Sequence, residues 1–147
     1  MAQRYFDTDV LIVGSGPVGL TLASELTRHG VHCRIVNKNS TVRETSKALI
    51  LHVRTQEVFE AMGMIEQAKA EAKPLHQVEL HAYGQHIGHW RLAGVDSPHS
   101  SPVIIGQNRI EHLLEQHLQQ LGGSVEWQTE AIALEQDADS ITATLPA

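Results

Sequence analysis

The 147-residue chain contains 41% hydrophobic and 19% charged residues, a balance typical of one globular domain with its own core. Its formal net charge of -6 at pH 7, without a basic stripe, argues against nucleic acid and anionic membrane surfaces as partners. No apolar run approaches the roughly 18 residues of a membrane span, and the single cysteine, Cys33, fits a cytoplasmic protein without an internal disulfide.

The first elements form a strand, a glycine turn, a helix and a second strand. Residues 8–13 (TDVLIV) predict a short buried strand, and the pattern of residues 17–28 predicts a helix. Pro17 suits the first helical turn, and Gly30 is a typical C-terminal stop. Residues 31–36 predict the second strand. A connection of this length favours parallel pairing of the two strands.

The middle of the chain alternates polar and periodic segments. Residues 38–47 are polar and predict a loop. A helical pattern over residues 54–72 is broken near Gly63 and ends before Pro74. Residues 77–92 predict two strands around a turn at Tyr83 and Gly84.

The last third begins with a loop over residues 94–102. A helix follows over about 108–121 and ends at the Gly122-Gly123 pair. Three short strands are predicted near residues 124–128, 131–136 and 140–145. The elements together predict an α/β fold with a Rossmann-like parallel core and an inserted antiparallel hairpin.

The glycine turn is the strongest chemical signal in the sequence. Gly14, Gly16 and Gly19 form a G-x-G-x-x-G pattern between a predicted strand and a predicted helix. A diphosphate can approach the backbone where side chains are absent, and the helix N-terminus offers N–H donors to the anion. Gly19 permits close packing of helix and strand. The pattern therefore predicts a dinucleotide site.

The residues at the end of the second predicted strand do not decide which cofactor binds. A dinucleotide-binding fold usually places an acidic residue there to bind a ribose hydroxyl, but this chain has Asn37 followed by Lys38. Asn37 can bind an adenosine ribose without charge assistance. Alternatively, Asn37 and Lys38 can accept the 2′-phosphate of NADP.

Four blocks carry a resemblance over nearly the whole chain: DVLIVGSGPVGLTLASELTRHGV, TSKALILHVRTQEVFEAMGM, IIGQNRIEHLLEQHLQQLGG and VEWQTEAIALEQDADSITATL. In this order they resemble the FAD-dependent aromatic hydroxylases, the single-component flavin monooxygenases similar to p-hydroxybenzoate, phenol and polyketide hydroxylases. The resemblance implies that residues 1–147 are the N-terminal portion of a Rossmann-like FAD-binding domain of the GR2 type. It also implies that about 77–102 begin the sheet of the substrate domain.

The resemblance further implies a set of FAD contacts. It places a glycine-rich group around the diphosphate, Asn37 at the ribose and Lys38 near the adenosine. Lys47 stands where the family usually has arginine beside the diphosphate, and lysine offers only a point charge there. The complete set of expected cofactor-binding residues is Gly14, Ser15, Gly16, Pro17, Gly19, Asn37, Lys38, Lys47, Ala48, Gln107 (on the flavin side) and Ala131 (at the adenine). Arg54 and Arg109 match family arginines that either touch FAD or brace the fold.

The function implied by the resemblance is that of a monooxygenase. NAD(P)H would be the reductant, and oxygen and an aromatic molecule the substrates, while no side chain of this chain is assigned a catalytic role because the flavin carries the reaction. Family members are several hundred residues long, so the chain is expected to be a fragment, a split gene or a truncated homologue. It is then not expected to hydroxylate alone. It could form a homo-oligomer, or a partner chain could supply the missing C-terminal part. A non-catalytic binding or assembly module and an NADP-binding reductase domain remain alternatives.

Histidines are frequent, with ten in the chain, and His86 and His89 form an H-x-x-H pattern. Residues three apart on a regular strand face opposite sides of a sheet. We therefore expect no metal site here.

Overall fold

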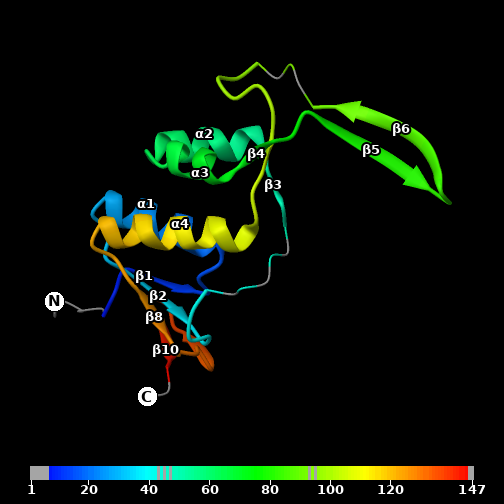
Figure 1. The fold of residues 1–147 in the computed structure, drawn as a ribbon. Helices are drawn as coiled ribbons and strands as arrows, with labels where there is room; N and C mark the ends of the chain where they lie inside the picture. The colour runs from blue at the N-terminus through cyan, green and yellow to red at the C-terminus, as the bar shows by residue number, and fades with distance from the viewer. Residues whose placement is uncertain are drawn as a thin grey trace. The chain divides into compact units, whose positions relative to one another are not determined.

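The computed structural model describes residues 7–145 except for residues 43, 45, 47, 93 and 95 (Figure 1). The chain divides into two compact units. The first unit combines residues up to 45 with those from 111 onward, and the second contains residues 46–110. Helix α4 (Gln107–Gln120) begins in the second unit and continues in the first. Among the described residues, no helix is long and apolar enough to cross a membrane.

The core of the first unit is a parallel sheet with the strand order β1-β2-β8. It contains β1 (Val10–Val13), β2 (Cys33–Asn37) and β8 (Val125–Trp127). Helix α1 (Pro17–Arg28) connects the first two strands and buries Leu20 and Ala23 on its apolar side. The predicted strand–turn–helix–strand unit and its parallel pairing are confirmed.

The C-terminal part of the first unit is a separate antiparallel pair. Strand β9 (Ala133–Gln136) pairs with β10 (Ile141–Thr144) around a turn at Asp137. The Asp137 carboxylate accepts hydrogen bonds from the backbone N–H groups of Asp139 and Ser140, and these bonds lower the pKa of Asp137. All three strands predicted for this region exist, but β8 joins the parallel sheet.

The second unit contains two helices, a small antiparallel sheet and a hairpin. Helices α2 (Val53–Ala61) and α3 (Ile65–Glu71) are separated at Gly63, whose φ of 78° is unfavourable for other residues. The small sheet has the order β3-β7-β4. Its strands, β3 (Ile50–Leu51), β7 (Val103–Ile104) and β4 (Lys73–Pro74), have two residues each and were not predicted, because two residues are too few for periodicity.

The predicted hairpin consists of β5 (Gln77–Ala82) and β6 (Gln85–Arg91). Tyr83 and Gly84 form its turn, and both have a positive φ, as a two-residue turn of this kind requires. The register pairs Glu79 with His89, Leu80 with Gly88 and His81 with His86.

A β-bulge in this hairpin overturns one sequence-based expectation. Ile87 has no partner in the register, so His86 and His89 count as neighbours on one face rather than as residues on opposite faces. Their rings are stacked, with centroids 6.4 Å apart and an interplanar angle of 17°. The expectation that these two histidines face opposite sides was therefore wrong, because the bulge makes the strand irregular.

Candidate cofactor-binding site

The glycine turn follows the carboxyl end of β1 in the first unit. Gly14 has a φ of 106°, a conformation that a side chain would strain, and its N–H donates to the Val36 carbonyl 2.8 Å away. This hydrogen bond fixes the start of the turn to the neighbouring strand β2. The turn thus leaves the sheet at the edge where the parallel strands end.

The other two glycines of the motif serve different purposes. A Cβ at Gly19 would collide with the Gly14 carbonyl oxygen and crowd Ile12, so Gly19 is needed for the close approach of α1 to the turn. A Cβ at Gly16 would meet no atom of the described residues within 4 Å, and the φ of Gly16 is -76°. The fold therefore does not itself require glycine at 16, and the open space above Gly14 and Gly16 can admit a ligand.

The N-terminus of α1 presents donors beside this open space. Gly16 is the N-cap, and no side chain of the described residues caps the helix. The hydrogen bond from the Leu20 N–H to the Gly16 carbonyl closes the first turn, and Pro17 lacks an N–H. The first turn carries no acidic residue, so the positive end of the helix dipole is not neutralised locally. The arrangement suits an anion such as a diphosphate.

Ser15 and Asn37 connect the turn to the end of β2. The Asn37 side-chain amide donates to the hydroxyl of the buried Ser15 at 2.6 Å, and its oxygen accepts from the Asn39 N–H at 2.9 Å. The backbone donor at Asn39 fixes which end of the amide is the oxygen. Each amide atom can form a further hydrogen bond, so Asn37 can still contact a ligand.

Lys38 lies next to Asn37 and forms an exposed ion pair. Its ammonium group is 3.2 Å from the Glu130 carboxylate, and the two side chains are 64% and 52% exposed. An ion pair this exposed contributes at most about 1 kcal/mol. The ion pair matters for the site because it places the negative charge of Glu130 beside Lys38.

The loop after β8 is tied to the same strand end. The Gln128 and Thr129 N–H groups donate to the carbonyls of Asn39 and Asn37, respectively. Ala131 follows in this loop and is half-buried. The structure thus places Ala131 in the loop that the end of β2 holds in position.

Two predicted site residues meet in the second unit. The Gln107 N–H donates to the Ala48 carbonyl and to the Ser46 hydroxyl, both at 2.9 Å, and the Ser46 hydroxyl donates to the Ala48 carbonyl at 2.6 Å. This three-residue group holds the start of α4 against the segment before β3. Lys47, the remaining predicted residue, lies outside the described residues.

The two arginines of open role both form ion pairs inside the second unit. Arg54 contacts Glu57 at 2.7 Å, and Arg109 contacts Glu71 at 2.6 Å. The hydrogen bond from Arg54 lowers the pKa of Glu57, and the bond to Glu71 raises the pKa of Arg109. These contacts connect neighbouring turns and helices, as bracing residues do.

A charge pair that was not predicted from the sequence supports the site. Arg34 in β2 and Glu126 in β8 form two parallel hydrogen bonds of 2.7 Å each. The hydrogen bonds from Arg34 lower the pKa of Glu126 despite its partial burial. The two residues are 92 positions apart, so no local pattern could have predicted their contact.

Comparison with known proteins gives consistent matches. The sequence model of the family described as "FAD binding domain" matches residues 7–146. The chain is 34% identical over 138 residues to 6-methylpretetramide 4-monooxygenase from Streptomyces rimosus, covering 92% of this chain and 25% of that protein. It is 31% identical over 153 residues to 2,4-dichlorophenol 6-monooxygenase from Delftia acidovorans, covering 95% of this chain and 26% of that protein.

A solved structure agrees with these sequence matches. The crystal structure of the flavin-dependent monooxygenase PieE in complex with FAD and substrate matches with a TM-score of 0.83 and 30% sequence identity. The match covers 94% of this chain and 26% of that one. The chain therefore spans about a quarter of the length of these three relatives.

Proposed function

The chain belongs to the FAD-binding domain family, and we propose that it forms the FAD-binding part of an NAD(P)H-dependent monooxygenase that hydroxylates an aromatic substrate. The observation that carries the proposal is the glycine turn. Gly16 faces open space beside an uncapped helix N-terminus, although packing among the described residues does not require glycine there. A diphosphate that closely approaches the backbone would explain why residue 16 is glycine.

Different residues would hold different parts of the cofactor. In the first unit, the backbone of residues 14–19 would bind the diphosphate, with Asn37 at the ribose and Ala131 at the adenine. Ala48 would lie in the segment next to the diphosphate, and Gln107 would lie on the flavin side of the cofactor. FAD, when bound, supplies the redox chemistry by accepting a hydride and reacting with oxygen. The chain itself binds and orients the cofactor.

The charge beside Lys38 favours FAD over NADP at this site. A 2′-phosphate would approach Lys38 but also meet the Glu130 carboxylate, which is 3.2 Å from the lysine nitrogen. Repulsion between the phosphate and that carboxylate would offset the attraction of the lysine. A neutral 2′-hydroxyl at Asn37 meets no such penalty.

The proposal of an aromatic substrate rests on the names of the relatives. One relative bears the name of a dichlorophenol monooxygenase, and the PieE structure contains FAD and a substrate. We further propose that the β5–β6 hairpin begins the substrate-binding sheet. We also propose that the protein forms a homo-oligomer or binds a partner chain, and that it resides in the cytoplasm, where a free cysteine stays reduced.

The proposal is tested by titrating the chain with FAD and with NADP, following flavin fluorescence and heat release. We expect FAD to bind more tightly than NADP. We expect Gly16→Ala to weaken FAD binding at least about tenfold, because its Cβ would occupy the approach of the diphosphate. The urea midpoint of this variant should stay unchanged.

The matched control is Gly88→Ala in the hairpin. Gly88, like Gly16, has open space around the position of a Cβ and no positive φ. This variant should bind FAD as the unmodified chain does. Tighter binding of NADP, or equal effects of the two alanine variants on FAD, would refute the proposal.

A further inference from the structure

One face of the β5–β6 hairpin gathers side chains that bind metals. Glu79 and His81 are two residues apart on β5, and their cross-strand partners on β6 are His89 and His86. Residues two apart on a strand point to the same face of the sheet, and so does the directly paired residue on the neighbouring strand. The bulge at Ile87 keeps His86 and His89 together on this face, which the H-x-x-H spacing alone would not allow.

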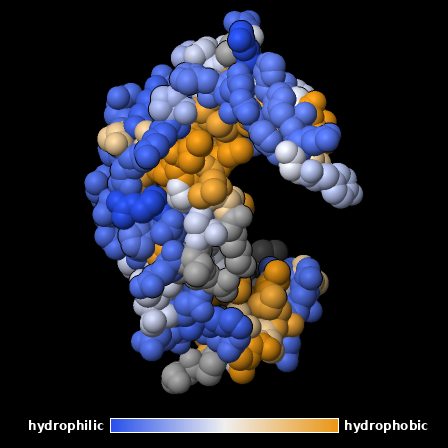
Figure 2. Space-filling model, turned by 45° about the vertical axis from the view of Figure 1, so that its right-hand side comes forward, coloured by the Kyte–Doolittle hydropathy of each residue, from blue (hydrophilic) through white to orange (hydrophobic). Residues whose placement is uncertain are grey.

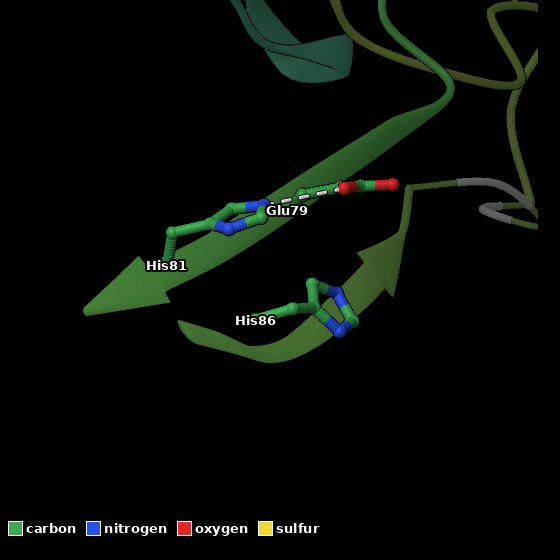
Figure 3. A group of neighbouring side chains, drawn as sticks. All are labelled: Glu79, His81 and His86. Carbon is green, nitrogen blue, oxygen red and sulfur yellow. Dashed lines mark hydrogen bonds and ion pairs between the residues drawn. The ribbon is translucent and has the colours of Figure 1, made fainter. Parts of the chain in front are cut away.

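Figure 3 shows that the side chains of Glu79 and His81 on β5 point toward each other, with His86 on the neighbouring strand β6. The His81 Nε2 atom lies 3.5 Å from a Glu79 carboxylate oxygen. The His81 and His86 rings meet edge to face, with centroids 5.1 Å apart. One ligand atom from each of Glu79, His81 and His86 lies within 4.8 Å of the other two. Among the described residues, this is the one group of three or more such side chains that could hold a metal ion.

We propose that this face binds a divalent transition-metal ion such as Zn²⁺ through Glu79, His81 and His86. Two imidazole nitrogens and a carboxylate oxygen form a ligand set typical of zinc sites with an open position. The His89 ring is stacked beside that of His86, with centroids 6.4 Å apart, and is not one of the three proposed ligands.

The required movement is small. Ligands at about 2.0–2.1 Å from a tetrahedral zinc ion lie about 3.3 Å apart. The present separations of up to 4.8 Å close to that value by side-chain rotation, because all three residues are exposed and their backbones are fixed by the hairpin register. No repacking of a core is needed.

Metal binding would stabilise the hairpin. Most side chains of β5 and β6 are exposed, and none of their residues is fully buried. A two-stranded hairpin with so little buried surface is weakly stable by itself. An ion bound to both strands in the folded state would link them. This inference does not depend on FAD binding, so the two proposals can fail separately.

The test is a calorimetric titration of the full chain, free of tags and chelators, with Zn²⁺. We expect one ion to bind per chain and His86→Ala and Glu79→Gln each to weaken binding at least about tenfold. The matched control is His112→Ala, an exposed histidine on α4 outside the group, which should bind zinc unchanged. Absence of zinc binding, or equal losses in the control, would overturn the proposal.

A second measurement uses the unmodified chain and so does not depend on any variant folding. Co²⁺ added to the protein should broaden the amide NMR signals of β5 and β6 selectively through its unpaired electrons. Excess Zn²⁺ should reverse the broadening. Selective broadening elsewhere in the chain would overturn the assignment of the site.

Discussion

Ser15 and Asn37 set the polar chemistry at the end of the parallel strands. Ser15 is a buried residue of the glycine turn, and its hydroxyl accepts a 2.6 Å hydrogen bond from Asn37. The bond ties the Asn37 side chain to the turn residue between Gly14 and Gly16. The residue that replaces the usual acid is therefore positioned in advance, without the charge that would strengthen a ribose hydrogen bond.

At the residue scale, we expect Asn37→Glu to strengthen FAD binding about fivefold, on the order of 1 kcal/mol. A carboxylate would accept the ribose hydrogen bond with charge assistance, and the Ser15 hydroxyl would donate to it instead of accepting. The dissociation constant of FAD measures the effect. Asn39→Glu, with the same added charge two residues later, is the control and should show no gain. An unchanged or weaker affinity of the Asn37 variant would mean that Asn37 does not contact the ribose.

At the scale of elements, a charged pair connects β2 to β8, which is an edge strand of the parallel sheet. Arg34 and Glu126 are about one-third exposed, so solvent screens their attraction and limits its contribution. Their two parallel hydrogen bonds nevertheless make the pair stronger and more specific in geometry than an ion pair with one hydrogen bond. The pair holds the strand that precedes the loop with Ala131.

We expect Glu126→Gln to lower the free energy of unfolding by about 1 kcal/mol near pH 7. Because Arg34 lowers the pKa of Glu126 in the folded state, this stabilisation is complete above the unfolded-state pKa and is lost as the pH falls through the folded-state pKa. Urea unfolding curves of both proteins should therefore converge in acid.

The control for this prediction is Glu130→Gln, which removes the partner of the more exposed Lys38. It should change the free energy of unfolding much less near neutral pH. A difference between the unmodified chain and Glu126→Gln that persists in acid would exclude the ion pair as its cause.

At the scale of the whole molecule, apolar side chains remain at the surface (Figure 2). Ile132, Leu134 and Ile141 in the β9–β10 hairpin are each at least 60% exposed. The register places them on one face of that hairpin. An exposed apolar face of this kind favours association with another surface.

We expect the chain to self-associate as its concentration rises, because contact would remove this apolar face from water. Leu134→Glu should shift the equilibrium toward the monomer by placing a charge on that face. Thr144→Glu is the control, since Thr144 is exposed on the opposite face of the same hairpin. Sedimentation velocity at several concentrations measures the effect. A monomer throughout, or equal effects of both variants, would contradict the expectation.

The sequence predicted most elements because their signals are local. Proline and glycine mark the ends of α1 and the break between α2 and α3, and Tyr83-Gly84 marks the hairpin turn. The three two-residue strands were not predictable from local patterns, because each exists only through pairing with a distant segment. Of the candidate site, the glycine turn was predictable because a short motif has a defined local structure.

By itself, the sequence determined the order of strands and helices, the position of the glycine turn and the resemblance to a flavoprotein family, since these depend on residues within a few positions of one another. Only the tertiary structure decided which distant residues meet. It paired Arg34 with Glu126, set Glu130 beside Lys38 and gave the hairpin a bulge that gathers histidines on one face. The physical reason is that strand order and register are set by contacts across the whole fold, which no short pattern records.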